Sequence, residues 1–441
     1  MRIGGIKQMP DITMCQQENC EKKLEDIGFY TLEDNRVKNT CITSPLWRNE
    51  LILTSRCNFN CPYCRGIKTD YSSDLPLDQV KNIINFWAKE NIQNIRFSGG
   101  EPTVYPYLKE VIKYTKDKCK NIKHIAVSTN GYADIEYYIE LINLGVNDFS
   151  ISLDACCAST GDMMTGGIKG AWQKVVDNIK EIAKLTYVTV GVVLTDDNIN
   201  ELSETIEFAH NLGVADIRII SSAQWNNIGR FKDIKVKQEI LDAHPILKYR
   251  INHFNIGRNV RGITEIDFHK CALVLDDMVV KENYHYPCII KMREGCEPIG
   301  ALNGNVRQDR YNYFKNHNSY TDPICQKNCL DVCIDYNNKY CKYQIDKTFL
   351  PKIDSSQFTW SKWESGSIHN FNLPCRFPSI TSLEGINILR KYAIGWNYGE
   401  KIVCRPKENH IALMCFKDDE KFWFHLRNKE FYEVFIDYKN K

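Results

Sequence analysis

The sequence lacks a run of about 18 consecutive apolar residues, so it contains no candidate for a membrane-spanning helix. Its N-terminus also lacks the continuous apolar segment of a secretory signal peptide. We therefore expect a cytoplasmic protein, in which cysteine thiols stay reduced. Net charge is nearly absent too, since 57 Lys and Arg face 55 Asp and Glu. The composition therefore indicates neither a membrane surface nor a nucleic acid as a partner.

Cysteine, by contrast, is abundant, with 19 copies among 441 residues. In a reducing compartment so many thiols favour metal ligands over disulfides. The length allows two or three domains of ~100–200 residues each.

Residues 50–221 alternate between short apolar, β-branched runs and amphipathic segments. Strands are expected at 50–55, 94–98, 122–128, 148–153, 187–195 and 216–221, and helices at 77–91, 107–117, 137–145, 171–185 and 201–213. Continuously apolar strands are typical of a parallel sheet that helices cover on both faces. The pattern predicts an α/β fold, a partial (β/α)6 TIM-like barrel, with functional groups at the carboxyl ends of its strands.

The chain divides into four predicted regions. An N-terminal extension (1–48) precedes the barrel (49–230), and a cysteine-rich, loop-rich auxiliary region follows (231–345). The aromatic C-terminal part (346–441) predicts a small α+β domain, in which residues 410–426 form a β-hairpin.

Three cysteines, Cys57, Cys61 and Cys64, follow the first predicted strand at the spacing C-x3-C-x2-C. A disulfide needs two thiols and a closed zinc site usually needs four ligands. A four-iron cluster normally takes four thiolates, so three would leave one iron open to another ligand. Because an open position distinguishes catalytic from structural metal sites, the triplet predicts a cluster that binds a cofactor or substrate. A partial zinc knuckle is the alternative.

These residues resemble a known signature. The segment CNFNCPYC (57–64) is similar to the cluster-binding motif of the radical S-adenosylmethionine (radical SAM) superfamily, with Tyr63 at the aromatic position. FSGGEP (97–102) resembles the second motif of that family, and STNG (128–131) and ISLDA (151–155) resemble its third- and fourth-strand signatures. The resemblance covers roughly residues 50–225 and implies a [4Fe-4S] cluster whose fourth position binds S-adenosylmethionine.

The resemblance also implies which residues surround S-adenosylmethionine. The GGEP segment would hold the methionine amino group, strand-end residues the ribose, and the backbone near Val193 and Leu194 the adenine. Lys169 or Arg218 could pair with the methionine carboxylate, although a solvated lysine and a salt-bridged arginine are the alternatives. The implied cofactor residues are Tyr63, Gly99, Gly100, Glu101, Pro102, Asn130, Ser152, Asp154, Lys169, Val193, Leu194 and Arg218.

In such a protein an electron donor such as flavodoxin or ferredoxin reduces the cluster. S-adenosylmethionine then breaks into methionine and a 5′-deoxyadenosyl radical, which abstracts hydrogen from the substrate. That substrate would be a peptide or a small molecule, or, by similarity to the twitch subgroup, a nucleotide. A different class of protein, a non-catalytic iron–sulfur or zinc-binding scaffold, remains an alternative.

A second set of cysteines follows residue 270. Cys271, Asn283 and Cys288 resemble the opening of the SPASM pattern, C-x(9–15)-G-x4-C, except that Asn replaces Gly. The later spacings depart from that pattern. We expect an auxiliary [4Fe-4S] cluster there, with structural zinc as the rival. Cys325, Cys329 and Cys333 would share one helix face, so binding a metal requires a broken helix or outside ligands. The candidate ligands are Cys271, Cys288, Cys325, Cys329, Cys333 and Cys341.

Overall fold

The fold is described from a computed structural model of the chain. The structure describes residues 36–38, 40–44, 46–65, 73–90, 92–222 and 234–349, and the backbone of five strands within 380–437. Among these residues no helix is both long enough and apolar enough to cross a membrane.

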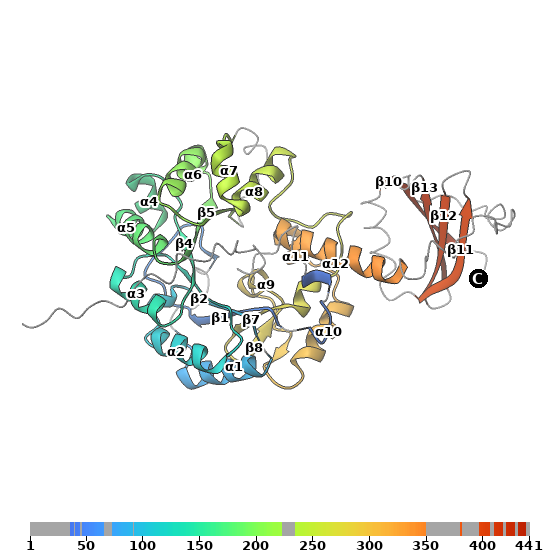
Figure 1. Cartoon of the computed structure of the whole chain (residues 1–441), viewed down its shortest axis with the longest axis horizontal. Coiled ribbons are helices and arrows are strands. Elements are labelled where there is room, and N and C mark those ends of the chain that lie inside the picture. Colours follow the sequence, from blue (N-terminus) through green and yellow to red (C-terminus); the bar gives the residue numbers. More distant parts are fainter. Residues whose placement is uncertain are drawn as a thin grey trace, which may run out of the picture.

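Six parallel strands form the sheet that the sequence predicts, in the order β6-β5-β4-β3-β2-β1 (Figure 1). Their bounds are β1 Arg48–Thr54, β2 Asn94–Gly99, β3 His124–Thr129, β4 Asp148–Ser152, β5 Tyr187–Leu194 and β6 Asp216–Ser221. All six predicted strands are thereby confirmed. The sheet stays open, as a partial barrel requires, because β1 and β6 are not paired with each other.

The sheet continues past β1 into the cysteine-rich region, which the sequence did not predict. β7 (Asp277–Lys281) pairs parallel with β1. β8 (Tyr284–Tyr286) then pairs antiparallel with β7, and β9 (Gly300–Ala301) pairs antiparallel with β8. The barrel and the first part of the cysteine-rich region therefore share one nine-stranded sheet.

Helices cover the outer face of the parallel strands (Figure 1). The five predicted ones are α1 Leu77–Lys89, α2 Leu108–Lys118, α3 Ile135–Asn143, α5 Ala171–Ala183 and α6 Leu202–Asn211. A short sixth helix, α4 (Ala158–Met164), was not predicted. On α1 the buried residues Val80, Ile83, Ile84 and Trp87 form one apolar stripe, which is why this segment packs as a helix.

The inner face of the barrel is polar, in contrast to the predicted strands with two apolar faces. On β1, Leu51 and Leu53 belong to the hydrophobic core, whereas Arg48 and Glu50 line an internal cavity. Successive side chains of a strand point to opposite faces, so this alternation separates an apolar layer under the helices from a polar interior.

The region after β6 is more helical than its sequence indicated. It contains α7 Gln238–Ala243, α8 Pro245–Asn255, α9 Ile289–Arg293, α10 Val306–Asn316, α11 Pro323–Asn328 and α12 Asp331–Phe349. A short 3-10 helix, η6 (Ala272–Leu275), packs with Phe268, Phe314 and Tyr336 in a second hydrophobic cluster. This cluster gives the region a core of its own.

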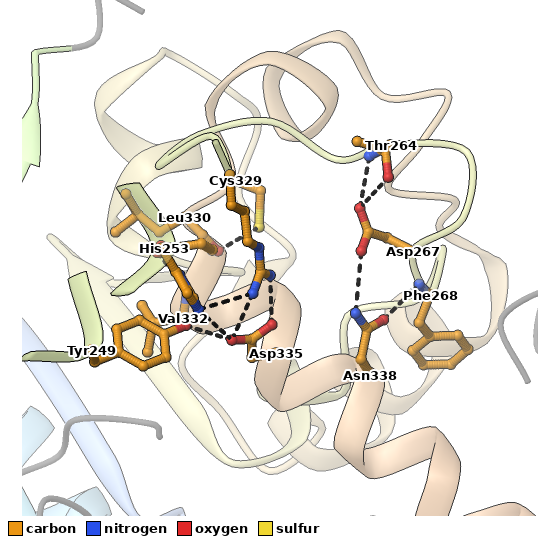
Figure 2. A network of polar contacts seen from close by, with 12 residues as sticks. Tyr249, His253, Thr264, Asp267, Phe268, Cys329, Leu330, Val332, Asp335 and Asn338 are labelled. Atoms are coloured by element: carbon orange, nitrogen blue, oxygen red, sulfur yellow. Dashed lines mark hydrogen bonds and ion pairs between the residues drawn. The ribbon is translucent and has the colours of Figure 1, made fainter. Parts of the chain in front are cut away.

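Polar contacts join α8 to α12 (Figure 2). The Tyr249 hydroxyl donates a 2.5 Å hydrogen bond to Asp335, and the Arg258 guanidinium also contacts that carboxylate. His253 Nδ1 lies 2.7 Å from an oxygen of Asp331, which also accepts from Arg250. Asp331 and Arg250 are both buried. Because α8 in turn packs on β6, this network fixes α12 relative to the barrel.

The C-terminal part contains a separate five-stranded antiparallel sheet, in the order β10-β14-β13-β12-β11 (Figure 1). Its strands are β10 Ile380–Thr381, β11 Asn397–Arg405, β12 His410–Lys417, β13 Glu420–Arg427 and β14 Phe431–Asp437. The predicted hairpin is confirmed as β12 and β13, which remain paired up to Lys417 and Glu420.

Candidate functional site

A cavity of about 840 Å³ opens inside the barrel and extends to the cysteine-rich region. Its lining includes the inner faces of the strands and the loops that follow β1, β2, β3 and β4. Eight cysteines contribute to it, and both predicted groups are represented: Cys57, Cys61, Cys64, Cys271, Cys288, Cys325, Cys329 and Cys333. The fold therefore brings the two cysteine groups to one space, although about 200 residues separate them in the chain.

The first group lies in the loop after β1, which we call the cysteine loop (residues 55–65). Backbone hydrogen bonds fasten it to the GGEP segment: Gly100 donates to Thr54 at 2.9 Å, and Glu101 donates to Arg56 at 2.8 Å. A Cβ atom on Gly99 would lie 2.3 Å from the Thr54 carbonyl oxygen, and one on Gly100 would lie 2.2 Å from that of Arg56. The missing side chains thus admit the cysteine loop itself, whereas the sequence analysis had related them to a ligand.

Two thiols of the cysteine loop, those of Cys57 and Cys61, have raised pKa values. Burial raises the pKa of Cys61 to about 12, and burial is also the largest cause of the raised pKa of Cys57. Thiolates are the ligand form of cysteine, so these side chains need a cationic centre to hold their charge. Together with Cys64, they place three thiols in one short loop, which is a fitting donor set for an iron–sulfur cluster with one open iron.

Glu101 is buried and organises the neighbouring strand ends. Its Oε1 accepts from Thr103 Oγ1 at 2.8 Å and Thr129 Oγ1 at 2.7 Å, as well as from the Thr103 amide. Its Oε2 accepts from the Asn130 amide at 2.6 Å, its one hydrogen bond to a described residue. Burial is the largest cause of the raised pKa of Glu101. Since a carboxylate oxygen has two lone pairs, Oε2 retains room for one more donor from the cavity, such as an ammonium group.

Asp154, two residues after the end of β4, connects three elements. Its Oδ2 accepts a hydrogen bond from the Tyr63 hydroxyl, and its Oδ1 accepts from the Val193 amide at 2.7 Å. Burial raises the pKa of Asp154 to about 6. Asn198, which the sequence analysis did not single out, donates to the carbonyls of Asp154 and Val193, both at 2.9 Å. In the sequence, its position in the polar loop after the fifth strand could have identified Asn198 as a candidate site residue.

The remaining predicted cofactor residues divide into two groups. Asn130, Ser152 and Arg218 line the cavity. Leu194 is buried in the hydrophobic core, so only its backbone could meet a ligand, and Pro102 begins the short helix η3 (Pro102–Val104). Lys169 is exposed and does not belong to the cavity lining.

The second group of cysteines comes from four separate elements. Cys271 precedes η6, Cys288 precedes α9, Cys325 lies in α11 and Cys333 in α12. Cys329 lies at the break between α11 and α12, so the three cysteines do not share one continuous helix. The charge of Cys271 contributes to the raised pKa values of Cys288, Cys325 and Cys329, as expected of neighbouring thiols. This arrangement removes the objection that a single helix face cannot surround a metal.

Cys341, the sixth predicted ligand of this group, lies elsewhere. It is 4% exposed and belongs to the hydrophobic cluster around Tyr336 and Phe314, and it does not line the cavity. Five thiols therefore remain close to the auxiliary part of the cavity, one more than a four-iron cluster normally binds.

Comparison with known proteins agrees with this geometry. The model of the Radical SAM superfamily matches residues 51–209. "Probable GTP 3',8-cyclase" of Sulfurisphaera tokodaii is 29% identical over 208 residues, which are 46% of this chain and 64% of that protein. A protein of the same description from Methanococcus maripaludis is 27% identical over 289 residues, 63% of this chain and 95% of the relative. Across the first seven curated relatives, the match spans 31% to 64% of the relative's length.

Solved structures were also matched, at lower similarity. The crystal structure of Streptococcus suis SuiB bound to S-adenosylmethionine has a TM-score of 0.43 and 14% identity, covering 69% of this chain and 76% of that chain.

The chain therefore contains a radical SAM domain at residues 51–209. Proteins of this superfamily use a [4Fe-4S] cluster and S-adenosylmethionine. The residues fit both the cluster and S-adenosylmethionine, since the three thiols of the cysteine loop line the same cavity as the glycine pair, the Glu101 carboxylate and the polar strand-end residues Asn130, Ser152 and Asp154.

Proposed function

We propose that this protein is a radical SAM enzyme that cleaves S-adenosylmethionine and uses the resulting radical to abstract hydrogen from a small-molecule or peptide substrate. The single observation that carries this proposal is the cavity, which joins the cysteine loop, the GGEP segment and the second cysteine group. A non-catalytic scaffold would have no need for such a volume between its metal ligands.

The chemistry begins with an electron from a donor such as flavodoxin or ferredoxin. Cys57, Cys61 and Cys64 would hold a [4Fe-4S] cluster, which would supply the electron for reductive cleavage of S-adenosylmethionine to methionine and a 5′-deoxyadenosyl radical. That radical would abstract a hydrogen atom from a substrate C–H bond, with 5′-deoxyadenosine and a substrate radical as the products. Enclosure of this step excludes water and competing reactions.

The chain's own residues bind and orient the cofactor. In the proposal, Oε2 of Glu101 accepts from the methionine ammonium, while Asn130, Ser152 and Asp154 contact the ribose at neighbouring strand ends. Val193 presents backbone to the adenine. Tyr63 acts as a positioning residue, because its hydrogen bond to Asp154 joins the cysteine loop to the ribose side of the cavity.

The second cysteine group is proposed to hold an auxiliary [4Fe-4S] cluster. Its ligands would come from Cys271, Cys288, Cys325, Cys329 and Cys333, which supply at least the four thiolates that such a cluster normally takes. Structural zinc on four of these thiols is the competing assignment.

A nucleotide is a second candidate for the substrate. Both relatives named above carry the description "Probable GTP 3',8-cyclase", and among the described residues nine cationic side chains line the cavity against four carboxylates. The cationic residues are Arg48, Arg65, Arg96, Arg218, Arg250, Arg261, Lys281, Lys291 and Arg293.

The test is formation of 5′-deoxyadenosine by anaerobically reconstituted protein with S-adenosylmethionine and dithionite. We expect the wild-type protein to form it and Cys61→Ala to lose it. Cys119→Ala is the control, because Cys119 is a thiol of the hydrophobic core that does not line the cavity. A wild-type protein that binds four irons and forms no 5′-deoxyadenosine would refute the proposal.

A further inference from the structure

Glu50 is a buried carboxylate that has no polar partner within the described part of the chain. It is 6% exposed and lines the cavity from the inner face of β1. Among the residues that the structure describes, none forms a hydrogen bond or an ion pair with its side chain. Its register neighbour on β2 is Arg96, but Arg96 binds Ser128 at 3.0 Å and Asp148 at 3.2 Å instead. An isolated buried charge costs free energy, so its retention requires a reason.

Arg218, on β6, is the complementary case. Its Nη2 donates to Ser150 Oγ at 3.2 Å, and its Nε is buried and has no hydrogen-bond partner among the residues with a described position. No carboxylate of the described residues forms an ion pair with it. To reach Ser150 on β4 the side chain passes Gly191 on β5, whose added Cβ would lie 3.5 Å from Nη2. Burial lowers the pKa of Arg218 to about 10, which agrees with a guanidinium that lacks a counter-ion.

Two other arginines on the same polar interior are paired with carboxylates. Arg48 binds Asp277 through two contacts, at 3.3 Å and 2.7 Å, and Arg96 binds Asp148. Glu50 and Arg218 thus stand out as one carboxylate and one guanidinium that share a cavity, influence each other electrostatically and do not touch. A pair that served stability alone would be expected to close into direct contact.

Both side chains lie deep in the barrel. Glu50 is four residues before Thr54, the end of β1, and Arg218 is three residues before Ser221, the end of β6. At about 3.3 Å per residue, they lie ~10–13 Å below the level at which the GGEP segment contacts the cysteine loop. The methionine moiety, bound at that level, would leave this interior for another molecule.

We propose that Glu50 and Arg218 form the substrate-binding floor of the cavity and select a zwitterion, a molecule or residue that bears both an ammonium and a carboxylate. The ammonium pairs with Glu50 and the carboxylate with Arg218, so that both buried charges are compensated at once. This assignment rests on the proposed function and gives Arg218 to the substrate rather than to the methionine carboxylate. A nucleoside triphosphate fits less well, since it offers several negative charges and no ammonium.

Binding of simple amino acids tests the proposal directly. The reconstituted full chain, with saturating S-adenosylmethionine, is examined by equilibrium dialysis against glycine, β-alanine, 4-aminobutyrate and 6-aminohexanoate, with butyrate and butylamine as single-charge probes. We expect at least one amino acid to bind about tenfold more tightly than either single-charge probe. Both Glu50→Gln and Arg218→Gln should abolish that preference. If no amino acid is preferred, or if both variants retain the preference, the proposal is wrong.

Two further probes distinguish the competing assignments. Loss of S-adenosylmethionine affinity by about tenfold or more in Arg218→Gln would place this arginine at the cofactor. Preferred binding of GTP, weakened in both variants, would assign the floor to a nucleotide. Either result overturns the zwitterion proposal. Neither touches the proposed function, which fails only if the wild-type protein does not cleave S-adenosylmethionine.

A stability comparison separates binding from structure. In urea unfolding, Glu50→Gln should not lower the folded-to-unfolded ratio, since no partner is lost and an uncompensated buried charge is removed. Asp277→Asn, the matched control on the neighbouring strand β7, breaks two contacts to Arg48 and should reduce the ratio by more than about tenfold. Equal losses in the two variants would indicate that Glu50 is structural.

Discussion

The Tyr63 hydroxyl donates a hydrogen bond to the carboxylate of Asp154, across 91 residues of sequence. Tyr63 lies between the second and third cysteines of the cysteine loop, and Asp154 lies two residues after the end of β4. The other oxygen of Asp154 accepts the Val193 amide, so the cysteine loop, β4 and β5 form one connected unit. A cluster on the loop and a nucleoside at the strand ends would therefore be held in fixed relation.

Removing this hydrogen bond should weaken the binding of S-adenosylmethionine. A bond to a charged acceptor contributes about 1.5–3 kcal/mol, so Tyr63→Phe should raise the Kd by about tenfold or more, measured by equilibrium dialysis per bound cluster. Tyr107→Phe is the control, because Tyr107 is 46% exposed and lies outside the cavity lining. Unchanged affinity in Tyr63→Phe would show that this contact does not position the cofactor.

The glycine pair should tolerate no side chain. Gly99→Ala or Gly100→Ala places a Cβ within 2.3 Å of backbone, which must shift the cysteine loop. We expect destabilisation of about 2 kcal/mol or more and loss of S-adenosylmethionine binding, measured by urea unfolding and dialysis. Gly304→Ala meets no atom within 4 Å and should change neither quantity. A fully stable and binding-competent Gly100→Ala would contradict the described loop geometry.

The barrel could be predicted from the sequence because its information is local. Each strand carries apolar, β-branched residues, each helix an apolar stripe, and the cysteine and GGEP segments follow strands directly. What escaped prediction depends on partners far along the chain. Strand β7 is recognisable only when it pairs with β1, and α12 buries polar residues such as Asp331 and Asp335, whose partners lie on and just after α8.

Contacts between residues far apart in the chain also explain why the environments of individual site residues could not be predicted. Leu53 packs in the hydrophobic core, whereas Glu50 on the same strand faces the cavity. The sequence does not reveal that Glu50 is unpaired among the described residues, because this depends on the binding of Arg96 to Asp148 instead of to Glu50. Lys169 lies between α4 and α5, in the segment that follows β4, and its side chain does not line the cavity.

The buried network of α12 should be costly to break. Asp331→Asn leaves Arg250 without its charged partner and weakens the contact to His253, so we expect a loss of about 3–5 kcal/mol in unfolding free energy. Asp134→Asn removes an ion pair to Lys174 whose carboxylate side chain is 79% exposed, and should cost less than about 1 kcal/mol. Similar losses for the two variants would show that the network does not anchor α12.

The position of Cys341 leads to a prediction about iron. Cys288→Ser should lower the iron content of the auxiliary site, because Cys288 lines the cavity beside Cys271 and Cys325. Cys341→Ser should leave it unchanged, because Cys341 packs in the hydrophobic cluster. The measurement is iron per chain after anaerobic reconstitution. Iron loss confined to Cys341→Ser would reverse the assignment.

A pH-dependent contribution to stability should come from Asp216, whose carboxylate accepts the Ile246 amide at the start of α8 at 3.0 Å. Burial raises the pKa of Asp216 from 3.8 to about 7. The folded state therefore binds this proton more tightly than the unfolded state, and stability falls as pH rises from about 4 to 7. The decrease is at most about 4 kcal/mol.

The check is urea unfolding of the wild type and Asp216→Asn between pH 4.5 and about 7.5, the range that the shifted pKa defines. The unfolding free energy of the wild type minus that of the variant should decrease with pH. A difference that stays constant would show that Asp216 ionises normally in the folded protein.

The central claim is that one cavity holds two iron–sulfur clusters, one on each cysteine group. Its most direct test is iron, sulfide and zinc analysis of reconstituted wild-type protein and of the variant with Cys57, Cys61 and Cys64 all changed to Ala. Two clusters predict about eight irons in the wild type and about four, with matching sulfide, in the variant. A variant without iron that retains about one zinc would contradict the claim and make the second cysteine group a structural zinc site.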